Sequence, residues 1–162
     1  MISPSPAYDL PLLKKWMPVV LWLGLIFYFS TDQFSSSNMS QVLGPALERL
    51  FPGIPVDRVA FVHSLLRKLG HWGEYLVLSL LFLRALRDSR ADWKMHHTAL
   101  SIMFVFFYAA SDEFHQSFVP SRTASVNDIL IDLFGGICGI FWMILRAERK
   151  PSDAKQAARR NE

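Results

Sequence analysis

Four apolar segments set the strongest limit on what this chain can fold into. They cover about residues 14–31, 69–86, 98–118 and 125–145 of a 162-residue chain that is 51% hydrophobic. Each is close to the ~20 residues that a helix needs to cross a hydrocarbon core of ~30 Å. We therefore predict an all-α membrane bundle with four transmembrane helices, formed by a single domain that covers residues 1–162.

The lysines and arginines predict how this bundle is oriented. They gather before the first segment, between the second and third, and after the fourth. Because cytoplasmic loops carry the excess of positive charge, both termini should be cytoplasmic in a multipass protein of the inner membrane. Since the charges lie in small groups, the net charge of +3 does not indicate nucleic-acid binding. We expect the polar tail, 151–162, to be flexible beside anionic lipid.

Two further features bear on the class of protein. Lys14 and Lys15 before the first segment resemble the start of a signal peptide. No small-residue cleavage pattern follows that segment, so we expect a retained first helix. The single cysteine, Cys138, excludes an internal disulfide.

The long outer connection, 32–68, predicts a short interfacial helix in the first outer loop. Apolar residues recur there at a helical period, with a break at Gly44-Pro45 and a stop at Pro52-Gly53. Beyond Pro55 the helical spacing resumes, so the second membrane helix should begin outside the bilayer. We expect His63, on this extension, to be structural or exposed.

The ionisable residues near the ends of the segments lie at one depth, just under the outer surface. At 1.5 Å per residue, Asp112 lies about 21 Å along its helix from Thr98, within roughly 10 Å of the outer boundary. Spacings of three and four place these residues on one face of each helix, and a charge facing lipid costs on the order of 3 kcal/mol. We predict a polar pocket open to the outside, with an ion-pair network without chemistry as the alternative. The other members are His71, Glu74, Asp128 and Asp132.

Two motifs stand at the polar ends of the second and third segments. The second segment contains Lys68-x-x-His71-Trp72-x-Glu74-Tyr75, and the third ends with Asp112-Glu113-x-His115-Gln116-x-Phe118-Val119-Pro120-x-Arg122. These motifs resemble those of the VanZ-like family, which is named for a protein linked to resistance against the glycopeptide antibiotic teicoplanin. The resemblance, which covers Ser30 to about Gly139, implies a small multipass membrane protein acting on lipid-linked or cell-envelope material. This sequence departs at Asp132, where the resemblance implies Asn, and at Ser121, where it implies Gly.

One hypothesis for the pocket is an enzyme, a hydrolase or transferase acting on an envelope lipid or precursor. His115 or Glu113 would act as general acid or base, and Asp112 would orient His115. His71 and Glu74 are further candidate catalytic residues. The candidate substrate-binding residues, among which Lys68 and Arg122 would hold a phosphate or carboxylate, are Lys68, Gln116, Arg122, Tyr75, Asp128 and Asp132.

Three other interpretations stay open. A divalent metal, zinc or manganese, would suit nitrogen and oxygen ligands taken from His71, Glu74, Asp112, His115 and Asp128. The pocket could instead bind a membrane lipid head group, a lipid-linked precursor or a glycopeptide without turnover. A proton-coupled transporter is the third, as an oligomer formed through the Gly135/Gly139 face, whose GxxxG spacing favours close helix packing.

Overall fold

The structure is a computed structural model that describes residues 12–87, 94–122 and 124–160, with side chains for 12–35, 38–87, 94–122 and 124–147. Over these residues it is all-α, as predicted, and the number of transmembrane helices stays a prediction. The elements are α1 (Leu12–Phe29), the 3-10 turn η1 (Asp32–Phe34), α2 (Ser36–Leu50), α3 (Val56–Leu86), α4 (Met95–Gln116) and α5 (Val126–Arg160).

Two of these helices are long and apolar enough, by composition, to cross a membrane. They are α1 and the part of α5 from Val126 to Ala147. The predicted segment 69–86 falls within α3, and the predicted segment 98–118 ends two residues beyond α4, but both helices carry more polar residues. The predicted tail from residue 151 continues α5 as backbone to Arg160, and residues 161–162 lie outside the described part.

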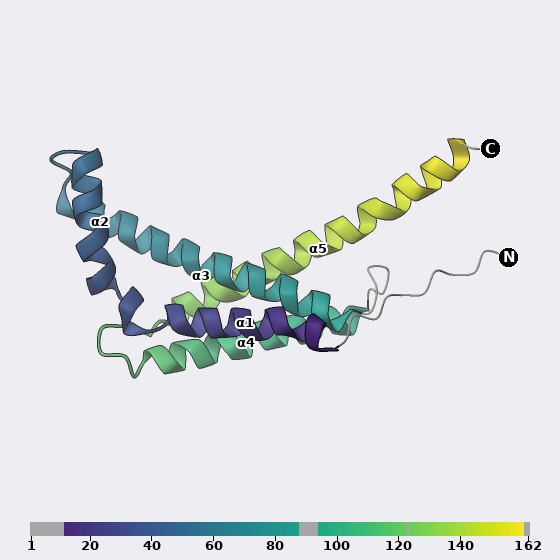
Figure 1. The fold of residues 1–162 in the computed structure, drawn as a ribbon, viewed down its shortest axis with the longest axis horizontal. Helices are drawn as coiled ribbons and strands as arrows, with labels where there is room; N and C mark the ends of the chain where they lie inside the picture. The colour runs from purple at the N-terminus through teal and green to yellow at the C-terminus, as the bar shows by residue number, and fades with distance from the viewer. Residues whose placement is uncertain (1–11, 88–93, 123, 161–162) are drawn as a thin grey trace.

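Helix α3 is the central element of the bundle, since it packs on α1, α2, α4 and α5. Its most extensive partner is α5, which crosses it near the middle of the molecule (Figure 1). The largest buried side chains of the core, Tyr75, Ile26 and Leu78, come from α3 and α1, and Val105 and Ala109 join them from α4. The middle of α3 therefore packs against α1 and α4 in the core.

Two glycines of α5 allow the close approach of α3. A Cβ on Gly135 would lie 2.2 Å from the carbonyl oxygen of Trp72, and one on Gly139 would lie 2.3 Å from Ser79 Oγ. Neither position tolerates a side chain unless the backbones move apart. The Gly135/Gly139 face, predicted to favour oligomerisation, is therefore covered by α3 of the same chain.

Helix α2 occupies the predicted outer connection. Its first turn is capped by Ser35, whose side chain accepts a hydrogen bond from the Asn38 amide. The helix continues through Pro45, so the predicted break at Gly44-Pro45 is wrong; one proline inside a helix removes one hydrogen bond and need not end it. It ends before the Pro52-Gly53 turn, where Gly53 has a φ of 79° that suits glycine.

The polar ends of three helices meet at one end of the bundle. Figure 1 shows the C-terminal ends of α1 and α4 beside the start of α5, and α3 passes the same level with its central turns. The four polar segments that the sequence placed at one depth are thus brought together.

Candidate functional site

A pocket of about 380 Å³ opens where these polar ends meet α2 and α3. Its apolar wall comes from α1, η1, α2 and α3, and its polar wall mainly from α3 and the chain around the end of α4. The lining residues are Phe29, Ser30, Phe34, Met39, Leu43, His63, Leu66, Arg67, Gly70, His71, Glu74, Gln116 and Arg122.

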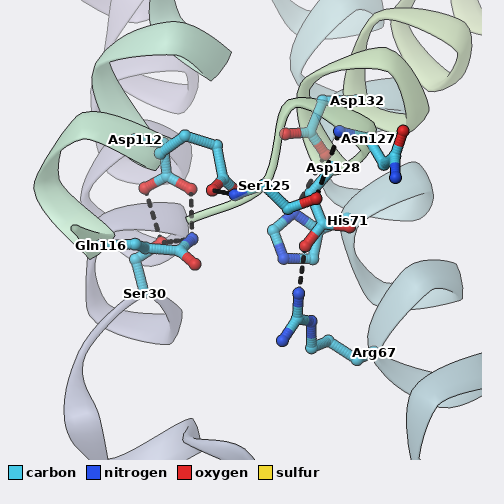
Figure 2. Close-up of polar contacts among 10 residues, drawn as sticks. Ser30, Arg67, His71, Asp112, Gln116, Ser125, Asn127, Asp128 and Asp132 are labelled. Atoms are coloured by element: carbon cyan, nitrogen blue, oxygen red, sulfur yellow. Dashed lines mark hydrogen bonds and ion pairs between the residues drawn. The ribbon is translucent and has the colours of Figure 1, made fainter. Parts of the chain in front are cut away.

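A group that we call the His71 cluster extends from the polar wall into the bundle: Arg67 and His71 line the pocket, and Glu113, Asp128 and Asp132 lie behind them. His71 Nδ1 lies 3.0 Å from Asp132 Oδ1, and Arg67 forms an ion pair with Asp128 (Figure 2). Both contacts join α3 to the first turns of α5. Asp128 and Asp132 are one helical turn apart, as are Arg67 and His71, so one pair of helix faces makes both contacts.

Glu113 joins this cluster from α4. Its Oε2 accepts a hydrogen bond of 2.8 Å from the Ser125 amide, which fixes the start of α5 against the end of α4. Ligand atoms of Glu113, His71 and Asp132 all lie within 4.8 Å of one another. In the part of the chain that the structure describes, Glu113 Oε1 and Asp132 Oδ2 are buried without a hydrogen-bond partner. The cluster therefore has unused acceptor capacity next to a pocket-lining histidine.

A second group, the Asp112 cluster, consists of Ser30, Asp112 and Gln116. Ser30 Oγ donates to Asp112 Oδ1 at 2.5 Å, and Gln116 Nε2 donates to Asp112 Oδ2 at 3.0 Å (Figure 2). All three side chains are buried. The cluster joins the end of α1 to α4, and both carboxylate oxygens of Asp112 are occupied.

Arg122 closes the pocket on the loop side. Its Nη2 donates to the carbonyl oxygens of Phe29 at 2.5 Å and Thr31 at 3.1 Å, and its Nε has no partner among the described residues. Burial lowers the pKa of Arg122, and the carboxylates of Asp112, Glu74 and Glu113 act in the opposite direction. An arginine remains charged under such conditions, so it presents a cation with spare donors to the pocket.

The structure divides the predicted site residues into three groups. His71, Glu74, Gln116 and Arg122 line the pocket. Glu113, Asp112, Asp128 and Asp132 lie behind it in the two clusters. The others lie elsewhere: Lys68 is exposed, and the His115 ring packs 4.5 Å from that of Phe27. The Tyr75 side chain is fully buried in the core, and its hydroxyl has no hydrogen-bond partner among the residues that the structure describes.

His115 is therefore not arranged as predicted. Asp112 was expected to orient it, but the oxygens of Asp112 bind Ser30 and Gln116 instead. His115 lies three positions from Asp112 and Gln116 lies four, and the helix turns the fourth position toward α1. The histidines that line the pocket are His63 and His71, and His71 is the one in contact with a carboxylate.

Three pocket residues were missed or placed differently by sequence reasoning. Arg67 takes the place expected of Lys68, and Ser30 was not among the predicted site residues. Arg67 is four residues before His71, so the i, i+4 spacing could have identified it. His63, expected to be structural or exposed, is half-buried and lines the pocket.

The candidate metal ligands in the structure also differ from those predicted from the sequence. Of the residues predicted from the sequence, only His71 belongs to the triad whose ligand atoms come together; the other two members are Glu113 and Asp132. One nitrogen and two carboxylates form a donor set that suits a divalent transition metal.

Comparison with known proteins gives one result beyond the geometry. No curated protein and no solved structure matched the chain. The family model described as VanZ/LLP1 matches residues 15–147, which include every helix that contributes to the pocket. The chain belongs to the VanZ/LLP1 family.

Proposed function

We propose that this chain is a four-span protein of the cytoplasmic membrane that binds the anionic head group of a lipid or lipid-linked envelope precursor in an outward-facing pocket. The four spans would be α1, the second half of α3, α4 and the first part of α5. At 1.5 Å per residue, the 18 residues of α1 and the 22 of α4 extend about 27 and 33 Å, close to the ~30 Å of a hydrocarbon core.

The two faces of α4 support this placement in a membrane. Its buried face carries Asp112, Glu113 and Gln116, whereas Phe107 and Phe114 are 63% and 68% exposed. A soluble bundle would bury the aromatic residues and expose the acids. Polar side chains turned inward under an apolar exterior are typical of helices surrounded by lipid.

One observation carries the choice of ligand: the pocket combines two arginines with an apolar wall. Arg67 and Arg122 each use part of a guanidinium within the protein and keep further N–H donors, which suit phosphate oxygens. Phe34, Met39 and Leu43 form an apolar surface on the α2 side, where an acyl or isoprenoid chain would lie. A phosphate-bearing lipid matches both halves of the pocket.

Membership of the family supports a role in the cell envelope, and we propose that this role includes protection against teicoplanin. Acid–base or metal-assisted chemistry on the bound lipid is a second candidate function. The observation that favours it is the pair of unpartnered carboxylate oxygens beside His71. Binding of the head group comes first in either case.

The test is lipid binding by purified protein in nanodiscs. We expect Arg122→Gln and Arg67→Gln to weaken binding of a phosphate-bearing lipid at least tenfold, because each removes a charged donor from the pocket. Arg58→Gln is the matched control, since Arg58 is an exposed arginine near the start of α3. Mass spectrometry of the recovered lipid tests for chemical change, and teicoplanin susceptibility of cells expressing each variant tests the role in resistance.

Equal affinity for anionic and zwitterionic lipids in the unmodified protein would contradict the proposed ligand. An unaltered lipid after incubation would reject the catalytic candidate and leave the binding function standing.

A further inference from the structure

We propose that His71, Glu113 and Asp132 form a binding site for one divalent transition-metal ion, of the manganese or zinc type. The three residues come from α3, α4 and α5, and their ligand atoms lie within 4.8 Å of one another. This inference does not depend on the lipid that occupies the pocket.

The unpartnered oxygens provide the second line of evidence. Glu113 is 3% exposed and Asp132 is 0% exposed, and each leaves one carboxylate oxygen without a hydrogen-bond partner among the described residues. A buried acceptor without a partner costs about 1–3 kcal/mol, and more when it is charged. Both unsatisfied groups belong to the same three-residue set, so one cation would satisfy both.

The local charge supports a dication. Arg67 is already paired with Asp128, which leaves Glu113 and Asp132 as two carboxylates beside one histidine. Two buried carboxylates in contact are stable only if they share a proton or a cation. A divalent ion would neutralise the pair and leave His71 as a neutral nitrogen ligand.

The spacing is close to that of a bound ion. Ligands held at about 2.0–2.2 Å from a metal lie about 3.0–3.5 Å from one another. His71 Nδ1 and Asp132 Oδ1 are already 3.0 Å apart. The remaining ligand atoms lie within 4.8 Å of one another and would move closer by side-chain rotation when an ion binds. An imidazole nitrogen favours manganese or zinc over calcium and magnesium, which select oxygen ligands.

The position of the site gives the metal a function in the pocket. His71 belongs both to the triad and to the pocket lining. A cation at the triad would therefore add positive charge to the wall that holds Arg67 and Arg122. It would bind a phosphate oxygen or a water molecule from the inner side.

The experiment uses the full chain in nanodiscs, first treated with a chelator and then titrated with MnCl₂ or ZnCl₂. We expect one equivalent of Mn²⁺ to bind, measured by loss of the free-ion signal in electron paramagnetic resonance. Glu113→Gln and Asp132→Asn should each weaken binding at least tenfold, and the double variant should bind no Mn²⁺. Asp112→Asn is the matched control, because Asp112 is a buried carboxylate on α4 outside the triad.

Pulsed measurements on the unmodified protein test the site without any variant. They should detect a ¹⁴N coupling from one imidazole at one equivalent of Mn²⁺. Absence of that coupling, less than stoichiometric binding of both metals, or equal binding by the double variant would overturn the proposal. Arg122→Gln should keep its metal affinity, so failure of the lipid-binding function and failure of the metal site give different results.

Discussion

The Asp112 cluster and the His71 cluster lie in the same bundle, but their carboxylates differ in how many of their oxygens accept hydrogen bonds. Both oxygens of Asp112 accept hydrogen bonds, from the uncharged side chains of Ser30 and Gln116. Among the described residues, Asp132 and Glu113 each keep an oxygen without a hydrogen-bond partner, although both side chains are buried. The first cluster joins α1 to α4, and the second joins α3, α4 and α5.

This difference distinguishes acidic residues that stabilise the fold from acidic residues that keep an oxygen for a ligand. A carboxylate whose two oxygens each accept a hydrogen bond contributes to stability and has less acceptor capacity left for a ligand. A carboxylate that keeps a buried, unused oxygen lowers stability until something binds there. Removal of Asp112 should therefore harm folding, whereas neutralisation of Asp132 should harm ligand binding.

The largest loss of stability should come from disrupting the close contact between α3 and α5 at Gly135 and Gly139, which we call the α3–α5 seam. This contact builds the His71 cluster. A methyl group at Gly135 would lie 2.2 Å from the Trp72 carbonyl oxygen, and a backbone atom cannot rotate away. We expect Gly135→Ala to lower the free energy of unfolding by about 3 kcal/mol. Thermal unfolding in detergent measures this loss.

Gly73→Ala is the control for the seam, because a Cβ at Gly73 meets nothing within 4 Å. It should leave the stability unchanged or slightly raised, since alanine favours the helix. Equal destabilisation by both substitutions would show that the seam has no special role.

An intermediate effect should come from the Asp112 cluster. Asp112→Ala removes the acceptor for Ser30 and Gln116 together, so we expect a loss of about 1.5–2 kcal/mol in stability. Metal affinity, measured on the fraction that remains folded, should stay within a factor of about three. If metal binding disappears while stability is retained, the division between the two clusters is wrong.

The smallest effect on stability should come from the His71 cluster itself. Asp132→Asn keeps an oxygen for His71 and replaces the unpartnered oxygen by an amide, so stability should change by less than about 1 kcal/mol. Affinity for Mn²⁺ should nevertheless fall at least tenfold. A large loss of stability, measured by the same thermal unfolding, would instead mean that Asp132 has a mainly structural role.

The sequence predicted more of the fold than of the site. Helical periodicity identified helices at each predicted segment, and the placement of acids at helix ends predicted that they would meet. Periodicity alone does not set the rotation of a helix about its axis to better than one residue. Lys68 and Arg67 are 100° apart on an α-helix, and the structure turns Arg67, not Lys68, toward the pocket.

The same limit explains why the sequence favoured His115, whereas the structure places His71 at the pocket. Asp112 and His115 are three residues apart and share a face by spacing, but Asp112 binds Ser30, which directly follows α1. The GxxxG spacing correctly indicated close packing, yet it could not say whether the partner was α3 or a second copy. Contacts between helices decide such questions.

By itself, the sequence determined the helical class, the apolar exterior and the shared level of the acidic residues. All three follow from local composition and the 1.5 Å rise of a helix. Only the tertiary structure decided which carboxylates are satisfied and which keep a free oxygen. That property depends partly on partners far away in the chain: Ser30 lies 82 residues from Asp112 and His71 lies 61 residues from Asp132. No local pattern specifies these pairs.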